Sequence, residues 1–388
     1  QTSQDSSSVA IGNLAGQTDQ LHDGIAIGKS AGNANQGINI GALALLGRGG
    51  SIAIGTSAGE DSQQSGGVAI GYNAGMTTQG LQCVAIGGSA GNSSQAVGAV
   101  AVGGVSGYSA QGLYGVGVGY QAGSTSQGDR ATAVGPNAAQ TSQAQNAIAV
   151  GYKAGRTTQG IGSVAVGTLA GNNSQGDSAV AIGYGAGALT QGQFTVAVGA
   201  TAGATSQSTY GVAIGSSAGA TSQGSSSVAV GALAGNSVQG VQSVAVGVQC
   251  GQTSQGLQSV AVGRNAGQTD QGTQSVAIGY FTGKTTQGIS CVAIGERAGE
   301  SSQGASSIAI GKSAGKTSQG ANGIIINSSG ATVNNTTAGH INIESSTAWL
   351  RASGANWTSS GTTGNVSDIR LKENVNPITD ALSKVNTL

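Results

Sequence analysis

Residues 227–242 have the sequence SVAVGALAGNSVQGVQ, and close variants of this unit return every sixteen residues through most of the chain. Each unit carries a Val-Ala-Ile-Gly tetrapeptide or a near relative of it. A fixed period of this length indicates a solenoid, in which each repeat forms one coil and contacts only its neighbours. We therefore predict stacked coils rather than a globular core. The glycines that close the tetrapeptides, with no insertion between them, are Gly55, Gly71, Gly87, Gly103, Gly119, Gly135, Gly151, Gly167, Gly183, Gly199, Gly215, Gly231, Gly247, Gly263, Gly279, Gly295 and Gly311.

The composition excludes several other classes. The 388 residues include 72 Gly but only 2 Pro, and Gly does not recur at every third position, which excludes collagen. Disorder is disfavoured because Val and Ile are phased and can be buried together. Only 7% of the residues are charged and the net charge is zero, so we expect no nucleic-acid partner. We also expect no cofactor. No apolar run reaches the ~20 residues of a membrane span. The chain starts at Gln1 without a signal-peptide pattern, as a fragment or a processed product would.

The tetrapeptide is expected to form a short strand with two apolar faces. In the representative unit, Val228 and Val230 point to one side of the strand and Ala229 to the other. One face can fill the inside of the coil, while the other needs a partner outside it. Three chains around a common axis would bury the outer faces together. We therefore predict an all-β, homotrimeric parallel β-roll (β-solenoid) with sixteen-residue coils.

The second half of each unit differs from the first. Ala234-Gly235 is followed by a polar stretch, for which we expect a short second strand with one inward alanine and an otherwise wet surface. Glycine pairs such as Gly231 and Gly235 would supply turn conformations that residues with a Cβ resist. A glutamine falls eight residues after each repeat glycine. Stacked amides of this kind can bond to one another along the roll, and a row of ligand-binding amides is the alternative. These glutamines are Gln20, Gln36, Gln63, Gln79, Gln95, Gln111, Gln127, Gln143, Gln159, Gln175, Gln191, Gln207, Gln223, Gln239, Gln255, Gln271, Gln287, Gln303 and Gln319.

Other slots vary, which shows where they lie. The residue after the repeat glycine tolerates Pro136, Arg264 and several tyrosines, so it is expected to face solvent. The tyrosines either form a sugar-contacting surface or are simply exposed; they are Tyr72, Tyr120, Tyr152, Tyr184 and Tyr280. The three cysteines stand in small-residue slots without metal-binding spacing, and we expect no metal site; they are Cys83, Cys250 and Cys291.

The register changes once, near the beginning. The spacing from Gly28 to Gly41 and from Gly41 to Gly55 is shorter than sixteen residues, so we expect irregular coils near residues 29–55. If Gly12, Gly28 and Gly41 each close a coil, the roll has about twenty coils. At ~4.8 Å per coil it would be roughly 95 Å long.

The Ser-Val-Ala-Ile-Gly unit resembles the head repeat of the YadA-type trimeric adhesins. The resemblance covers roughly residues 8–327, although the sixteen-residue step is longer than the family's coil of about fourteen residues. It implies a trimer of left-handed parallel β-rolls, in agreement with the burial argument. We assign residues 1–327 to this shaft and residues 328–366 to a small β cap, with short strands at 341–343 and 349–350.

Residues 367–375, SDIRLKENV, resemble the opening of the intramolecular chaperone domain of the peptidase S74 family, which ends phage tailspikes and tail fibres. The resemblance implies that Ser367 is a nucleophile and Lys372 its base, and that the precursor cuts its own Val366–Ser367 bond in a single turnover. Only residues 367–388 belong to this domain here, far fewer than the family's domain has, so Ser367 and Lys372 are expected to be inert in this chain. A short helix is expected after Pro377.

These patterns favour a structural protein over an enzyme. We expect a virion component, a tail or capsid fibre whose rigid trimeric shaft supports host attachment. Its partners would be its own copies, other fibre or baseplate proteins and a host receptor that includes glycans. The alternative is the head of a bacterial YadA-like adhesin on the cell surface. A polysaccharide depolymerase would need paired carboxylates in a groove, and Asp and Glu are spread too thinly for that.

Overall fold

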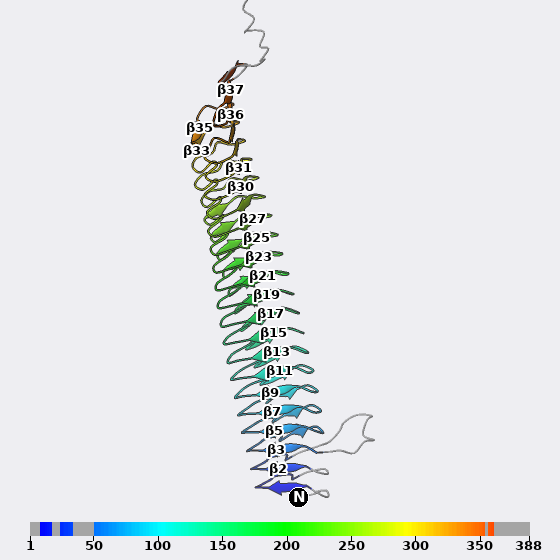
Figure 1. Ribbon diagram of the computed structural model, residues 1–388. Coiled ribbons are helices and arrows are strands. Elements are labelled where there is room, and N and C mark those ends of the chain that lie inside the picture. Colours follow the sequence, from blue (N-terminus) through cyan, green and yellow to red (C-terminus); the bar gives the residue numbers. More distant parts are fainter. Residues whose placement is uncertain (1–7, 18–23, 34–49, 354–355, 361–388) are drawn as a thin grey trace, which may run out of the picture.

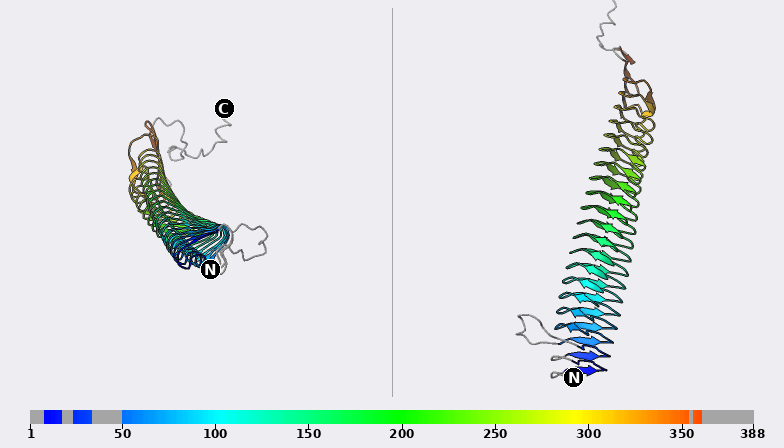
Figure 2. Two further views of the ribbon diagram at one scale, coloured as in Figure 1. Left: turned by 90° about the horizontal axis from the view of Figure 1, so that it is seen from below. Right: turned by 180° about the vertical axis from the view of Figure 1, so that it is seen from behind.

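The computed structural model describes residues 8–17, 24–33, 50–353 and 356–360. These residues form strands and turns without any helix, and they build a long parallel β-solenoid of stacked sixteen-residue coils (Figure 1). The predicted fold class is therefore confirmed. The coils turn gradually against one another along the stack, so the roll is slender and curved (Figure 2). The helix expected after Pro377 lies outside the described residues.

The Val-Ala-Ile tripeptides form one long parallel sheet, here called the first sheet. Successive strands pair in register, so that Val164 lies opposite Val180 and Ala165 opposite Ala181. Each coil contributes one strand at the same place in its repeat. The strands are β1 (Val9–Ile11), β2 (Ile25–Ile27), β3 (Ile52–Ile54), β5 (Val68–Ile70), β7 (Val84–Ile86), β9 (Val100–Val102), β11 (Val116–Val118), β13 (Thr132–Val134), β15 (Ile148–Val150), β17 (Val164–Val166), β19 (Val180–Ile182), β21 (Val196–Val198), β23 (Val212–Ile214), β25 (Val228–Val230), β27 (Val244–Val246), β29 (Val260–Val262), β30 (Val276–Ile278), β31 (Val292–Ile294), β32 (Ile308–Ile310), β34 (Ile324–Asn327) and β36 (Ile341–Glu344).

Shorter strands that end in the repeat glutamine form the second sheet, also parallel. Glutamines of neighbouring coils lie opposite each other, as Gln159 does with Gln175. Beyond the last of these strands, the glutamines continue the pairing as isolated bridges as far as Gln319. The strands are β4 (Ser62–Gln63), β6 (Thr78–Gln79), β8 (Ser94–Gln95), β10 (Ser109–Gln111), β12 (Thr125–Gln127), β14 (Thr141–Gln143), β16 (Thr158–Gln159), β18 (Ser174–Gln175), β20 (Thr190–Gln191), β22 (Ser206–Gln207), β24 (Ser222–Gln223), β26 (Val238–Gln239) and β28 (Ser254–Gln255).

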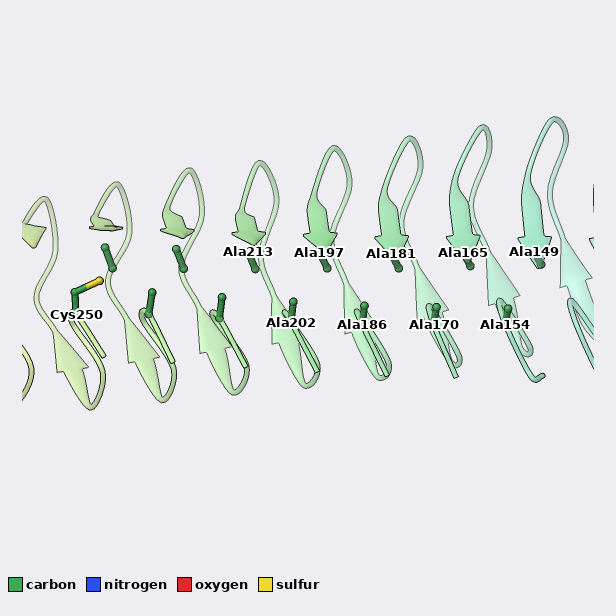
Figure 3. Packing of buried hydrophobic residues seen from close by; sticks show 14 of the residues in the cluster. Ala149, Ala154, Ala165, Ala170, Ala181, Ala186, Ala197, Ala202, Ala213 and Cys250 are labelled. Carbon is green, nitrogen blue, oxygen red and sulfur yellow. The ribbon is translucent and has the colours of Figure 1, made fainter. Parts of the chain in front are cut away.

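The core of the roll is a double column of alanines. The middle residue of each first-sheet strand, such as Ala165, points inward, and so does the alanine three residues after the repeat glycine, such as Ala170 (Figure 3). Both are 0% exposed. Only a small side chain fits on each side because the two walls of a coil are close together. The expected alternation of two apolar faces is confirmed, and the structure shows that the alanine side faces inward and the Val or Ile side outward.

The repeat glycines are required by the close stacking of the backbone. Gly71 has a φ of 130°, and a Cβ built on it would lie 2.7 Å from the carbonyl oxygen of Gly87 in the next coil. Gly75, four residues later, has a φ of 53° in the left-handed region. The turn role expected for the glycine pairs is confirmed.

The irregular start of the roll differs in one respect from the expectation. β2 pairs directly with β3, and Ala26 lies opposite Ala53. The stack therefore passes from the coil of Gly28 to that of Gly55 without a rung that ends at Gly41. Gly41 itself lies outside the described residues. A break near residues 29–55 was expected, but counting Gly41 as the end of a stacked coil was wrong.

The regular roll ends near residue 327. Ile325 takes the place of the inward alanine opposite Ala309 and packs near Val333, so the last coil has a wider core. β33 (Ala314–Gln319) pairs with β35 (Val333–Asn335), and β36 then turns back into β37 (Trp349–Ser353) and β38 (Asn356–Ser360), which pair antiparallel. The strands expected at residues 341–343 and 349–350 are present.

Candidate interaction surface

The glutamine column lies inside the roll, although the sequence suggested a wet second strand with an inward alanine. From Gln63 to Gln319 these side chains are only 0–3% exposed. In a typical coil, the amide Nε2 of Gln143 donates to the backbone carbonyls of Thr132 at 2.9 Å and Ala147 at 3.1 Å. Each glutamine thus satisfies carbonyl groups that face the interior of its own coil. The inward residue of the second strand is therefore glutamine, and the alanine precedes that strand.

Glutamines of neighbouring coils also bond to one another, as the ladder interpretation predicts. The Nε2 of Gln143 donates to Oε1 of Gln159 at 3.1 Å. Because the amides are buried, they cannot form a row of ligand-binding groups, and that alternative is wrong. Gln20 and Gln36 lie outside the described residues. The bonded pairs are Gln95–Gln111, Gln111–Gln127, Gln127–Gln143, Gln143–Gln159, Gln159–Gln175, Gln191–Gln207, Gln271–Gln287 and Gln287–Gln303.

The outer face of the first sheet is apolar. The last residue of its strands remains partly exposed, as in Ile182 at 40%, Ile214 at 41% and Ile310 at 37%. The turns that lead into some of the strands add exposed apolar residues such as Ile161 and Ile289, whereas others carry polar residues such as Asp177. Because the strands are in register, these side chains form a stripe along the roll. We call this surface the Val/Ile face.

The outer face of the second sheet has the opposite character. The residue before the buried glutamine is usually a serine or threonine and is exposed, as in Thr190, Ser206 and Ser222. Val238, 52% exposed, is an exception. The contrast between the two sheets makes the roll amphipathic. The continuous apolar surface of the roll is therefore on the first sheet rather than on the second.

A third surface follows the turn after each repeat glycine. We call the slots one, two and five residues after that glycine the turn edge. Residues of neighbouring coils meet there: Gln140 Nε2 donates to Gln121 Oε1 at 2.9 Å, and Arg156 Nε donates to Gln140 Oε1 at 3.1 Å. The solvent position predicted for the tyrosines is confirmed, since Tyr72, Tyr120, Tyr152, Tyr184 and Tyr280 are between 41% and 63% exposed.

The cysteines are buried in small-residue slots, as expected. Cys83, Cys250 and Cys291 are each 0% exposed and form no disulfide. Burial raises the pKa of Cys250 to about 12 and also raises the pKa of Cys83. The thiol of Cys250 donates to the carbonyl of Gly247 at 3.0 Å. These groups are packing residues rather than reactive thiols.

The predicted catalytic pair, Ser367 and Lys372, lies outside the described residues. Within the described residues, no group of three or more His, Cys, Asp or Glu side chains is placed to hold a metal ion. None of the described segments forms a helix able to cross a membrane.

No protein-family model matches the chain, and no match was found among curated proteins or solved structures. The class of molecule is therefore defined by its own architecture, a parallel β-solenoid with sixteen-residue coils.

Proposed function

We propose that the protein is the rigid shaft of a trimeric fibre, in which three rolls pack through their Val/Ile faces. The observation that carries this proposal is the apolar stripe along the first sheet, set against the hydroxyl-rich second sheet. Monomeric soluble proteins rarely expose continuous apolar surface on this scale. In a closed trimer each copy offers the same stripe to the others, and the hydrophobic effect holds the shaft together along its length.

The function of such a shaft is mechanical. Successive coils are joined by backbone hydrogen bonds along the stack, and several neighbouring coils are also joined by bonds between their glutamines, so bending one coil strains its neighbours. The described coils contain few long loops that would act as hinges. A rod of this kind gives reach and stiffness, which are the properties that a host-attachment fibre needs. We place it in a virion, where other fibre or baseplate proteins would hold one end.

Lysine substitutions on the Val/Ile face, compared with lysine substitutions on the second sheet, test which face forms the interface. We expect Ile182→Lys/Ile214→Lys to shift the chain from trimer to monomer in multi-angle light scattering, because it puts two ammonium groups into an apolar contact. Thr190→Lys/Ser222→Lys, on the second sheet of nearby coils, is the matched control and should leave the mass unchanged. If both variants keep the mass of the unmodified protein, the Val/Ile face is not the interface.

Maturation belongs to the same proposal. In a precursor that continues through a complete chaperone domain, Ser367 Oγ would attack the carbonyl carbon of Val366 while a neutral Lys372 takes its proton. The Val366–Ser367 C–N bond would then break as that proton passes to the Ser367 amine, and water would hydrolyse the Val366 ester left on Ser367 Oγ. Mass spectrometry of that precursor should show a new N-terminus at Ser367, and Ser367→Ala should remain uncut. If the unmodified precursor remains equally intact, self-cleavage is wrong.

The head of a bacterial trimeric adhesin is a second function with the same architecture. The Val-Ala-Ile-Gly strands in register favour it equally, because both assemblies need a trimeric roll. The sequence beyond Leu388 discriminates between them. A chaperone domain there supports the fibre, whereas a coiled-coil stalk followed by a membrane anchor supports the adhesin.

A further inference from the structure

Charge is distributed unevenly along the roll. Between residues 157 and 263 the only charged residue is Asp177, whereas charged side chains are frequent from Arg264 onward. Within residues 264–319, the cations all occupy slots one, two or five after a repeat glycine, which places them on the turn edge. They are Arg264, Lys284, Arg297, Lys312 and Lys316.

Three of these cations surround a pair of aromatic rings. The rings of Tyr280 and Phe281 lie with their centroids 4.2 Å apart and tilted by 56°. The Arg264 guanidinium from the preceding coil lies 5.9 Å from the centre of the Tyr280 ring. Lys284 Nζ lies 4.6 Å from the Phe281 ring centre, and the Arg297 guanidinium from the following coil lies 5.8 Å from it. We call these five residues the aromatic–cation cluster.

The cluster is incompletely neutralised. Of the nearby carboxylates, Glu296 pairs with Lys312 at 3.4 Å and Glu300 lies 4.0 Å from Arg297. Within the described residues, Arg264 and Lys284 form no ion pair. Arg264 is exposed and Tyr280 is 41% exposed, so a cation and a ring are open to solvent side by side.

We propose that the aromatic–cation cluster binds an acidic sugar unit of a polysaccharide. The apolar C–H face of a pyranose ring would pack on Tyr280, and its carboxylate or sulfate would meet Arg264 and Lys284. A guanidinium presents a planar fork of donors that matches either oxyanion. A neutral sugar would leave both cations without an anion. The inference rests on the proposed fibre function and identifies the part of the shaft that would contact a host surface.

Binding of the full chain to three immobilised polymers tests the assignment. Polygalacturonate offers carboxylates, dextran sulfate offers sulfates, and unmodified dextran offers neither. We expect surface plasmon resonance to detect binding to at least one acidic polymer and none to dextran, and the stronger of the two acidic signals identifies the anion. Arg264→Gln/Lys284→Gln should weaken that binding at least about tenfold, and Tyr280→Ala should weaken it even at a salt concentration that screens the charges.

Lys153→Gln is the matched control. Lys153 Nζ lies 4.9 Å from the Tyr152 ring centre on the same turn edge, but in a simpler site with a single ring. Its loss should leave the affinity unchanged. Failure to bind either acidic polymer, equal binding to dextran, or equal losses from Lys153→Gln and from the double variant would each overturn the inference. Light scattering and circular dichroism on the same samples verify assembly and folding. A folded trimer that does not bind acidic sugars therefore contradicts this inference but not the proposal of a fibre shaft.

Discussion

At the scale of single residues, the roll depends on backbone conformations that most residues avoid. Besides the glycines, each regular coil places residues in the left-handed region at the second slot after the repeat glycine. Val105 has a φ of 60° and Asn73 a φ of 54° at this slot. A β-branched residue is strained there, whereas asparagine adopts the region readily. The slot therefore stores local strain wherever the sequence departs from Gly or Asn.

We expect Val105→Asn to stabilise its coil by about 1 kcal/mol, because asparagine relieves that strain. The amide of residue 105, which donates to the Gly88 carbonyl at 2.9 Å, is retained in the variant. Hydrogen exchange of the amides near residue 105 measures the local unfolding free energy. The reciprocal control, Asn73→Val, should lower it by a similar amount at its own coil. A destabilised Val105→Asn would contradict the strain argument.

The buried thiols make a second prediction at this scale. We expect none of the three cysteines to react with a thiol-specific disulfide reagent at pH 8 in the folded chain, and all three to react in denaturant. The folded pKa of Cys250, about 12, exceeds its ordinary value of 9.0. An unfolded thiol therefore ionises first, and the stability of the folded state falls between these two pH values. Cys250→Ala, which restores the usual residue of the slot, should reduce that loss.

At the scale of elements, neighbouring coils compensate for each other's departures from the repeat. Gly117 replaces the inward alanine of β11, and Ser106 replaces the alanine that faces it. Ser106 Oγ donates to the carbonyl of Gly117 at 2.8 Å. A Cβ built on Gly117 would lie 2.7 Å from the same Ser106 Oγ. The two exceptions therefore fit together as a pair.

A double-mutant cycle tests this pairing. We expect Gly117→Ala alone to destabilise the coil by about 1 kcal/mol or more through overpacking. Adding Ser106→Ala, which restores alanine in both slots, should recover most of that loss in chemical denaturation. The expected coupling is about 1 kcal/mol in favour of the double variant. Simple additivity of the two changes would mean that the residues are independent.

The buried glutamines also stabilise individual coils, through hydrogen bonds to interior carbonyls. Gln143→Met keeps most of the volume but leaves the carbonyls of Thr132 and Ala147 without their buried donor. A cost of about 1–3 kcal/mol is expected for orphaned buried groups. The loss should concentrate in the coils that contain residues 132–159, as hydrogen exchange can show, because coils interact only with their neighbours. An exchange pattern equal to that of the unmodified chain would mean that the amide contributes little.

The sequence predicts some of these features and leaves others undetermined, for physical reasons. Alternation along Val-Ala-Ile separates the alanine from the two larger residues, since strand geometry alone decides that they face opposite sides. Which side lies inside depends on the width of the closed coil, and the sequence does not give it. The repeated glutamine is equally compatible with an inner or an outer column, because its burial depends on interior carbonyls that appear only once the coil closes. The aromatic–cation cluster combines slots from three coils, so it emerges only when the stacking is known. Gly41 resembled a repeat glycine, but β2 pairs directly with β3, so no first-sheet strand ending at Gly41 lies between them.

At the scale of the whole molecule, the repeat that closes each coil also leaves the apolar side chains of the Val/Ile face exposed. A solenoid stabilised by nearest-neighbour contacts does not need a partner in order to stack. Its Val/Ile face nevertheless remains in contact with water in a single chain. The proposal of a fibre shaft depends on that face being covered by further copies of the same chain.

Sedimentation equilibrium of the unmodified protein measures this most directly. A closed trimer through the Val/Ile faces should give a mass three times the 37.0 kDa of one chain, independent of concentration over the working range. A mass of one chain at every concentration, with the Val/Ile face left in water, would contradict the account.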